Sequence, residues 1–208
     1  MSDERTRVRD FFTERAADWD ARFAGDGPAY ASAVGLLGLR PGDAVLDAGC
    51  GTGRALPALR EAVGPAGRVL GADLTPAMLR EAVRAGRDRS AALMLADVER
   101  VPLGDAVLDA VFGGGLVSHL ARPQAGLREL ARVVRPGGRL ALFHPVGRAA
   151  LAARHGRALS EDDLRAETRL GPLLARAGWR LDAYTDEDDR FLALARRTPA
   201  TGGGPATP

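Results

Sequence analysis

The sequence contains no lysine, a single cysteine and few aromatic residues, which make up 5% of the chain. One cysteine excludes an internal disulfide. All 29 basic residues are therefore arginines, and they are scattered among 27 acidic residues, which predicts a solvated charged surface and no nucleic-acid-binding patch. No apolar run approaches the roughly 18 residues that a membrane span requires, so no membrane association is expected.

The N-terminal residues 1–5 are charged and no apolar segment follows them, so the sequence carries no recognisable secretion signal. Together with the single cysteine, this predicts a soluble, cytoplasmic protein. The 208 residues are 46% hydrophobic and 27% charged, which is enough for one globular domain with its own core.

The most informative stretch is residues 45–53, which read VLDAGCGTG. A short apolar run predicts a buried strand, the glycines at every second position predict a tight turn, and a helical pattern follows. Glycines leave main-chain N–H groups accessible to a ligand, because they carry no Cβ atom. The helix that follows adds the positive end of its dipole. The stretch therefore predicts a binding site for a polar, nucleoside-like ligand at the end of a strand.

The same stretch departs from the dinucleotide fingerprint Gly-x-Gly-x-x-Gly, because Arg54 stands where the third glycine is needed. It reads instead Asp-x-Gly-x-Gly-x-Gly, with Asp47 at the end of the strand. A carboxylate at that point would repel a pyrophosphate and suit a ligand with an ammonium group. The stretch resembles motif I of the class I S-adenosylmethionine (SAM)-dependent methyltransferases.

The remaining pattern alternates apolar runs with amphipathic segments. Strands are expected at residues 44–48, 68–73, 91–96, 107–112, 139–143, 179–184 and 190–195. Helices are expected at residues 4–23, 30–37, 56–63, 76–85, 125–134 and 170–177, with a short one beginning at Ser160. This alternation predicts an α/β, doubly wound parallel sheet.

The last two expected strands are joined by only five residues, too few for a parallel crossover, so they form a C-terminal antiparallel hairpin. That arrangement is the Rossmann-like, seven-stranded methyltransferase fold. We expect residues 1–40 to form a helical cover, residues 41–197 the SAM-binding domain and residues 198–208 a disordered tail.

The resemblance also implies roles for individual residues. Asp73 matches the acid that takes both ribose hydroxyls, and Asp97, with the adjacent Val98, matches the one that accepts from the adenine amino group. Residues 129–138 are close to a segment that precedes the fifth strand in the family. The implied cofactor-binding residues are Asp47, Gly49, Cys50, Gly51, Gly53, Asp73, Leu74, Met78, Asp97, Val98 and Gly113. The cofactor is SAM, with S-adenosylhomocysteine as the product, and no metal is implied.

To catalyse methyl transfer, such a protein mainly has to position the acceptor nucleophile in line with the methyl group of SAM. Where the acceptor is a hydroxyl or phenol, a base is also needed, and His144 and His119 are the candidates because they follow expected strands. An aromatic face on the cover would suit a sulfonium, and Trp19, Phe23 and Tyr30 are candidates for it.

The absence of two known motifs narrows the range of possible methyl acceptors. Residues 112–115 read FGGG where methylases of DNA amines carry Asn/Asp-Pro-Pro-Tyr/Phe, and the Pro-Cys pair of cytosine C5 methylases is absent. We therefore expect methyl transfer to a small molecule by a monomer or homodimer. Two alternatives stay open: a non-methylating reaction such as a cyclisation, and a SAM-binding partner protein without catalysis.

Overall fold

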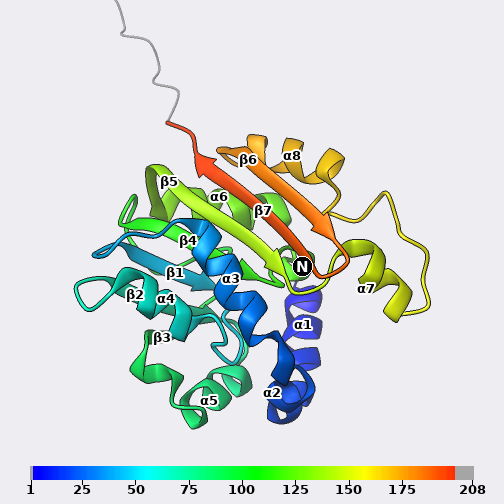
Figure 1. Ribbon diagram of the computed structural model, residues 1–208, viewed down its shortest axis with the longest axis horizontal. Coiled ribbons are helices and arrows are strands. Elements are labelled where there is room, and N and C mark those ends of the chain that lie inside the picture. Colours follow the sequence, from blue (N-terminus) through cyan, green and yellow to red (C-terminus); the bar gives the residue numbers. More distant parts are fainter. Residues whose placement is uncertain (1, 200–208) are drawn as a thin grey trace, which may run out of the picture.

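The computed structural model describes residues 2–199, and its centre is a seven-stranded sheet (Figure 1). Residues 200–208, which make up most of the expected disordered tail, lie outside the described part. The strands are β1 (Ala44–Ala48), β2 (Arg68–Asp73), β3 (Ala92–Leu95), β4 (Leu108–Gly114), β5 (Val134–His144), β6 (Trp179–Glu187) and β7 (Arg190–Arg197). Their order across the sheet is β3-β2-β1-β4-β5-β7-β6.

Five neighbouring strands, from β3 to β5, run parallel, and β7 then pairs antiparallel with both β5 and β6. Asp47 of β1 lies in register with Gly71 on one side and Phe112 on the other. The predicted seven-stranded fold with its C-terminal hairpin is thus confirmed, and β1 is its central parallel strand. Consecutive parallel strands place their carboxyl ends at one edge, where ligands bind in such sheets.

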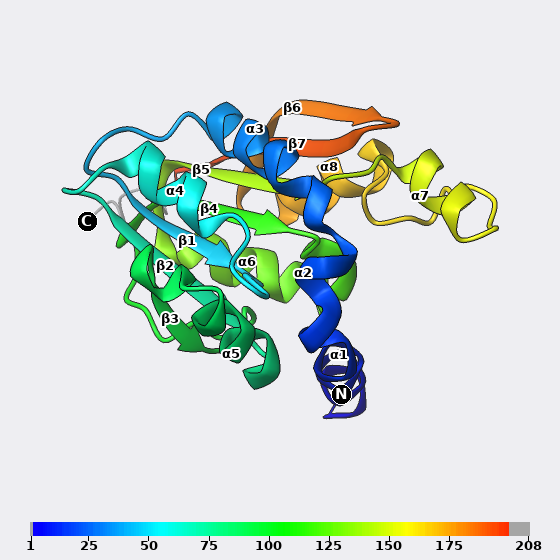
Figure 2. The same ribbon diagram turned by 60° about the horizontal axis from the view of Figure 1, so that its bottom comes forward.

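Helices cover both faces of the sheet, as Figure 2 shows. On one face, α3 and α4 bury Val34, Leu56 and Leu59 against β1 and β4. On the other, α6 and α8 bury Leu130 and Leu170. The helices are α1 (Ser2–Arg15), α2 (Trp19–Arg22), α3 (Gly27–Leu37), α4 (Leu56–Val63), α5 (Pro76–Arg84), α6 (Pro123–Val133), α7 (Arg148–Arg154) and α8 (Glu167–Arg176).

The prediction of one continuous helix over residues 4–23 is wrong, because the α-helix that begins the chain ends at Arg15. A short 3₁₀ turn over Ala16–Asp18 separates α1 from α2, and Ala16 is buried against α5. The next helix also begins earlier than expected, at Gly27, because Pro28 suits the first turn of a helix. The N-terminal segment can therefore bend around the edge of the sheet.

The region after β5 differs from the expectation as well. No helix begins at Ser160; its hydroxyl accepts a hydrogen bond from the amide of Asp162, and Asp163 accepts one from the amide of Arg165. Both are local side-chain-to-backbone bonds that favour turns over helix. The segment between α7 and α8 is therefore a series of turns.

Strand β5 begins earlier than expected, at Val134, which pairs with Leu108; the register then shifts over the Arg-Pro-Gly-Gly stretch, and pairing resumes at Arg139. At the far edge, the buried indole of Trp179 donates a 2.8 Å hydrogen bond to the carbonyl of Leu127 in α6. This bond joins the antiparallel hairpin to the helical layer. Within residues 2–199, no helix combines the length and apolar character needed to cross a bilayer.

Candidate cofactor and acceptor site

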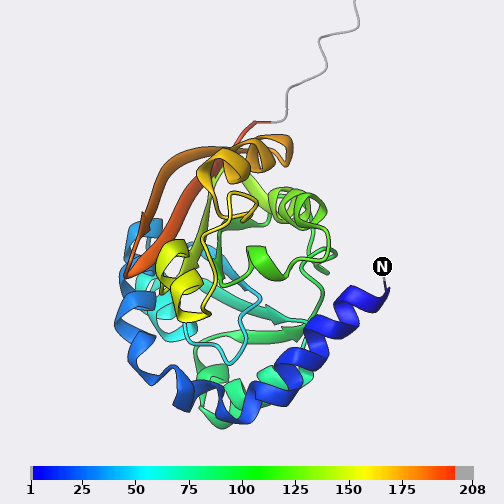
Figure 3. The ribbon, with the colours of Figure 1, turned by 90° about the vertical axis from the view of Figure 1, so that its right-hand side faces the viewer.

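A cavity of about 880 Å³ opens at the carboxyl ends of the parallel strands. Figure 3 looks toward those ends, with α1 (dark blue) along one side and α7 (yellow) along the other. Residues from the ends of β1, β2 and β3 line one part of the cavity, and residues that follow β4 and β5 line another. The N-terminal helices close the space from outside.

The glycine-rich turn after β1 forms the floor of this cavity. Gly49, Gly51 and Gly53 all have positive φ angles, of 68°, 55° and 82°, which favour glycine. The amide of Gly51 donates a 2.8 Å hydrogen bond to the carboxylate of Asp73 at the end of β2. The turn is therefore held by the neighbouring strand, and its main chain is exposed to the cavity.

Asp47 is 2% exposed, and its carboxyl group has no hydrogen-bond partner among residues 2–199. Burial and the nearby charge of Asp73 raise the pKa of Asp47 to about 8. Burial also raises the pKa of Asp73, against the opposing effect of amide bonds from Thr75 and Gly51. A buried carboxyl without a partner, at the wall of a cavity, fits the ammonium group of an amino-acid ligand.

The expected adenine-side residues Leu74, Met78, Asp97 and Val98 line the same cavity. Asp97 is already engaged, because its carboxylate lies 3.1 Å from the guanidinium nitrogen Nε of Arg5 in α1. Arg5 Nη2 also lies 2.7 Å from Glu99. An arginine of the cover thus occupies the carboxylate that the resemblance assigns to adenine.

The N-terminal segment is attached to the glycine-rich turn by polar contacts. The hydroxyl of Thr52 donates a 2.6 Å hydrogen bond to Asp20, and Arg87 forms a 2.6 Å ion pair with the same carboxylate. Arg54 pairs with Asp26 and donates to the carbonyl of Phe23. The cover and the motif I turn therefore form one connected unit.

Aromatic rings on the cover face the cavity. Phe12 packs against Trp19 with ring centres 5.4 Å apart, and Trp19 packs against Phe23 at 4.8 Å. Trp19 and Phe23 line the cavity as expected, together with Phe12. Tyr30 also lines it but packs its ring against Phe143, and burial raises its pKa to about 12.

His119 and His144 both line the cavity. The ring of His119 packs against that of Phe12, with centres 5.0 Å apart. His144 Nδ1 lies 2.8 Å from the carbonyl oxygen of Val146 and 3.1 Å from the amide nitrogen of the same residue; in the tautomer in which Nδ1 donates to the carbonyl, Nε2 is free to accept a proton. Burial lowers the pKa of both rings, with a further contribution from the positive charge of Arg165, so both are neutral at pH 7.

Two implied residues lie outside the cavity wall. Gly53 closes the turn by donating to the carbonyl of Cys50, and Gly113 lies inside β4, where an added Cβ would meet Leu116. The next glycines, Gly114 and Gly115, line the cavity instead. The other implied cofactor residues and all the candidate base and cover residues line it: Asp47, Gly49, Cys50, Gly51, Asp73, Leu74, Met78, Asp97, Val98, His119, His144, Trp19, Phe23 and Tyr30.

Residues that the sequence analysis did not name as candidates also line the cavity, among them Arg5, Phe12 and Arg165. The helical spacing of Phe12 and Trp19 within residues 4–23 is the signal that could have indicated Phe12. Arg5 and Arg165 carry no local signal, since each is one arginine among 29 basic residues.

Comparisons with known proteins agree with this geometry. Residues 46–142 match the family model described as a methyltransferase domain. The chain is 39% identical over 133 residues to malonyl-[acyl-carrier protein] O-methyltransferase of Serratia marcescens, covering 63% of this chain and 49% of that protein. It is 36% identical over 113 residues to the ubiquinone/menaquinone biosynthesis C-methyltransferase UbiE of Cupriavidus taiwanensis, covering 51% and 45%. The chain spans about half the length of these curated relatives.

Among solved structures, a SAM-dependent methyltransferase from Aquifex aeolicus superposes with a TM-score of 0.67 at 25% identity, covering 81% of this chain and 89% of that one. The glycine turn, the strand order and these matches together identify a SAM-dependent methyltransferase domain in this chain, with residues 46–142 matching the family model. SAM is accordingly the cofactor of this domain. Within residues 2–199, no cluster of three or more His, Cys, Asp or Glu side chains is arranged to hold a metal ion.

The raised pKa of Asp47 makes stability depend on pH. The folded protein keeps this proton up to about pH 8, whereas the unfolded chain releases it near the ordinary value. The stabilising contribution is thus present at low pH and is lost as the pH rises toward 8. Relative to Asp47→Asn, which mimics the protonated form, wild type should lose about 2–3 kcal/mol of unfolding free energy between pH 5.5 and 7.5.

Urea denaturation without SAM at those two pH values measures this difference. Asp88→Asn, an exposed position away from the cavity, is the matched control. A difference between wild type and Asp47→Asn that stays constant with pH would mean that Asp47 is ionised in the free protein.

Proposed function

We propose that this protein transfers the methyl group of SAM to a small-molecule acceptor. The observation that carries the proposal is Asp47, a buried carboxyl without a hydrogen-bond partner, placed beside an accessible glycine turn in a large cavity. The relatives of this chain include a C-methyltransferase named for ubiquinone/menaquinone biosynthesis and a malonyl-[acyl-carrier protein] O-methyltransferase. The location in the cytoplasm and the monomeric or dimeric state stay predictions from the sequence.

Bound SAM would supply an activated methyl group on a sulfonium, so the protein has mainly to bind, orient and exclude water. In this proposal, Asp47 holds the ammonium group and becomes ionised as it does so. Asp73 accepts from the ribose hydroxyls, and Met78 and Leu74 flank the adenine. Asp97 would have to leave Arg5 in order to accept from the adenine amino group.

The cover completes the cavity around the reacting groups. Trp19 and Phe23 place aromatic rings at its wall, which suits both a cation and an apolar acceptor. His144 is the first candidate for a base, because its Nδ1 is held by Val146 while its pKa is lowered by burial. His119 is the second candidate.

The test of the function has two steps. Calorimetric titration with SAM, S-adenosylhomocysteine and NADH is expected to show micromolar binding of the two sulfur nucleosides and none of NADH. Incubation with SAM and a panel of small phenols, quinols and carboxylic acids should then yield a product heavier by one methyl group. Binding of SAM with a changed acceptor of unaltered mass would favour a non-methylating reaction, and failure to bind SAM would contradict the proposal.

Replacing Asp73 by asparagine should weaken SAM binding by about 1–3 kcal/mol, because charge-assisted hydrogen bonds to the ribose are lost. The same titration measures this effect, with Asp88→Asn as the control for a surface change of the same kind. Since Asp73 also holds the glycine turn, circular dichroism of the variant has to confirm its fold. Unchanged affinity in a folded variant would place the ribose elsewhere.

His144→Gln should lower kcat by about 10²–10⁴-fold for a hydroxyl acceptor, the range for loss of a general base. In the wild type, the acidic limb of the pH–rate profile should lie below the ordinary histidine value, because burial lowers the pKa of His144. Activity should therefore fall only at acidic pH, and the variant should lose this limb. His119→Gln is the matched control; loss of the limb in that variant instead would assign the base to His119.

A further inference from the structure

Arg165 is a buried arginine in the wall of the cavity, at the side formed by β5 and α7. Only 8% of the residue is exposed. Its Nε and Nη2 donate to the two carboxylate oxygens of Asp163 at 3.1 and 2.8 Å, and Tyr184 donates to its carbonyl at 2.8 Å. The third nitrogen, Nη1, has no hydrogen-bond partner among residues 2–199.

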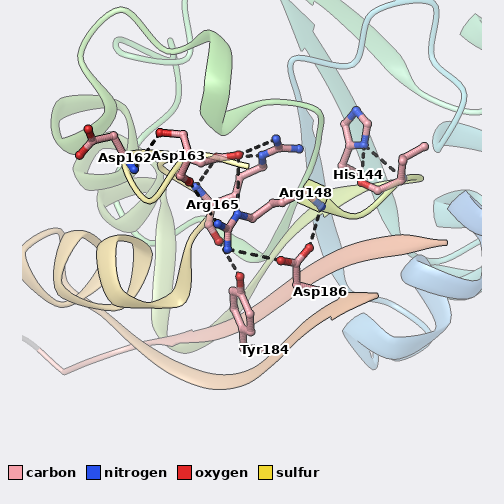
Figure 4. Close-up of polar contacts among 9 residues, drawn as sticks. His144, Arg148, Asp162, Asp163, Arg165, Tyr184 and Asp186 are labelled. Atoms are coloured by element: carbon pink, nitrogen blue, oxygen red, sulfur yellow. Dashed lines mark hydrogen bonds and ion pairs between the residues drawn. The ribbon is translucent and has the colours of Figure 1, made fainter. Parts of the chain in front are cut away.

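The surrounding network holds the guanidinium group of Arg165 in place, but no member of it accepts a hydrogen bond from Nη1. Figure 4 shows Arg148, Asp163, Arg165, Tyr184 and Asp186 gathered in one network, with His144 to one side. Arg148 lies 3.6 Å from Asp163 and 3.4 Å from Asp186. Two guanidinium groups and two carboxylates therefore balance in charge, and the fork of Arg165 is held rigidly.

Excess positive charge comes from neighbouring residues that also line the cavity. Arg154 and Arg157, at the end of α7 and just beyond it, are exposed and form no ion pair within the described part of the chain. Arg22 lines the opposite wall, on the cover, and likewise has no ion-pair partner there. Two arginines without an ion-pair partner, Arg154 and Arg157, thus lie on the same side of the cavity as Arg165, and Arg22 lies across from them.

The carboxylates that line the cavity lie elsewhere or are already paired. Asp47 and Asp73 lie near the ends of β1 and β2, Asp97 lies just beyond β3, and Asp26 pairs with Arg54. The acids of the hairpin turn do not line the cavity, and Asp186 is engaged with Arg148. The two parts of the cavity are therefore opposite in charge, with carboxylates on the cofactor side and arginines beside β5.

We propose that the side of the cavity beside β5 and α7 binds an anionic group of the acceptor, a carboxylate or a phosphate, with Nη1 of the buried residue Arg165 as the donor. Arg154 and Arg157 attract the anion at the mouth. The rings of Phe12, Trp19 and Phe23 face the rest of the acceptor, so it carries an apolar body as well. This inference rests on the proposed function, because it assigns the acceptor of that reaction.

Because Asp163 takes the Nε–Nη2 edge of Arg165, the anion would bind at Nη1, whose two N–H groups can form charge-assisted hydrogen bonds to a carboxylate or phosphate. In a buried position the interaction is also less screened than at the surface. The anion is an anchor in this proposal and sets which acceptors bind. Its proximity to His144 and His119 would place the reacting end of the acceptor near the candidate bases.

Four probes with the same eight-carbon chain test the proposal: octanoate, octyl phosphate, octanol and octyltrimethylammonium. Each is titrated calorimetrically into the protein, with and without saturating S-adenosylhomocysteine. We expect at least one of the two anions to bind about ten-fold or more tightly than octanol, and the ammonium to bind no better than octanol. The tighter of the two anions identifies the group.

Substitutions of the arginines test which of them cause the preference for anionic probes. Arg165→Gln should abolish the preference for anions while leaving octanol binding unchanged, and Arg165→Lys should retain part of it. Because Arg165 is buried, the exposed double variant Arg154→Gln/Arg157→Gln is the second test, and it should lower anion affinity several-fold. Arg176→Gln, an exposed position of α8 outside the cavity, is the control.

The outcomes separate this inference from the proposed function. The inference would be overturned if octanol and both anions bound equally well, or if the ammonium bound more tightly than octanol. It would also be overturned if Arg165→Gln and Arg154→Gln/Arg157→Gln both folded and both kept the full preference for anions. Loss of S-adenosylhomocysteine binding would count against the proposed function alone, since the probes are also titrated into the free protein.

Discussion

The structure depends on two carboxyl groups buried next to each other at the ends of adjacent parallel strands. Asp73 holds the glycine turn through the amide of Gly51, and Asp47 has no partner of its own. Their mutual repulsion and burial raise the pKa of Asp47 to about 8. The protein keeps this unfavourable arrangement at the one place where a cationic, hydroxyl-bearing ligand would relieve it, which is the expected balance between stability and binding.

The N-terminal segment is attached at the same edge of the sheet as the two buried carboxyl groups. Asp20 reaches Thr52 and Arg87 next to the turn, and Arg5 reaches Asp97 and Glu99 beyond β3. The cover is thus attached through groups that belong to, or adjoin, the cofactor side. If Asp97 accepts from the adenine amino group, as proposed, then cofactor binding and the position of the cover are linked, because Arg5 holds the same carboxylate.

Charge divides the cavity into two parts. Carboxylates gather where β1, β2 and β3 end, and arginines gather where β5 ends. A parallel sheet produces this division by itself, since each strand delivers its terminal side chains to one edge. The glycine turn and the strand-end acids make up the first part, and Arg154, Arg157 and Arg165 make up the second.

The sequence by itself determined the strands, the hairpin and most of the cofactor side, because apolar periodicity, glycine spacing and strand-end acids are local signals. It also identified Trp19, Phe23, His119 and His144 as residues near the cavity. It misplaced one wall glycine, Gly113 for Gly114, because a strand's last residue is a local detail of pairing. Only the tertiary structure decided that Arg5 meets Asp97 and that Arg165 lies buried beside β5. Those contacts join residues far apart in the chain or depend on turns, and one arginine among many carries no signal of its own before the chain is folded.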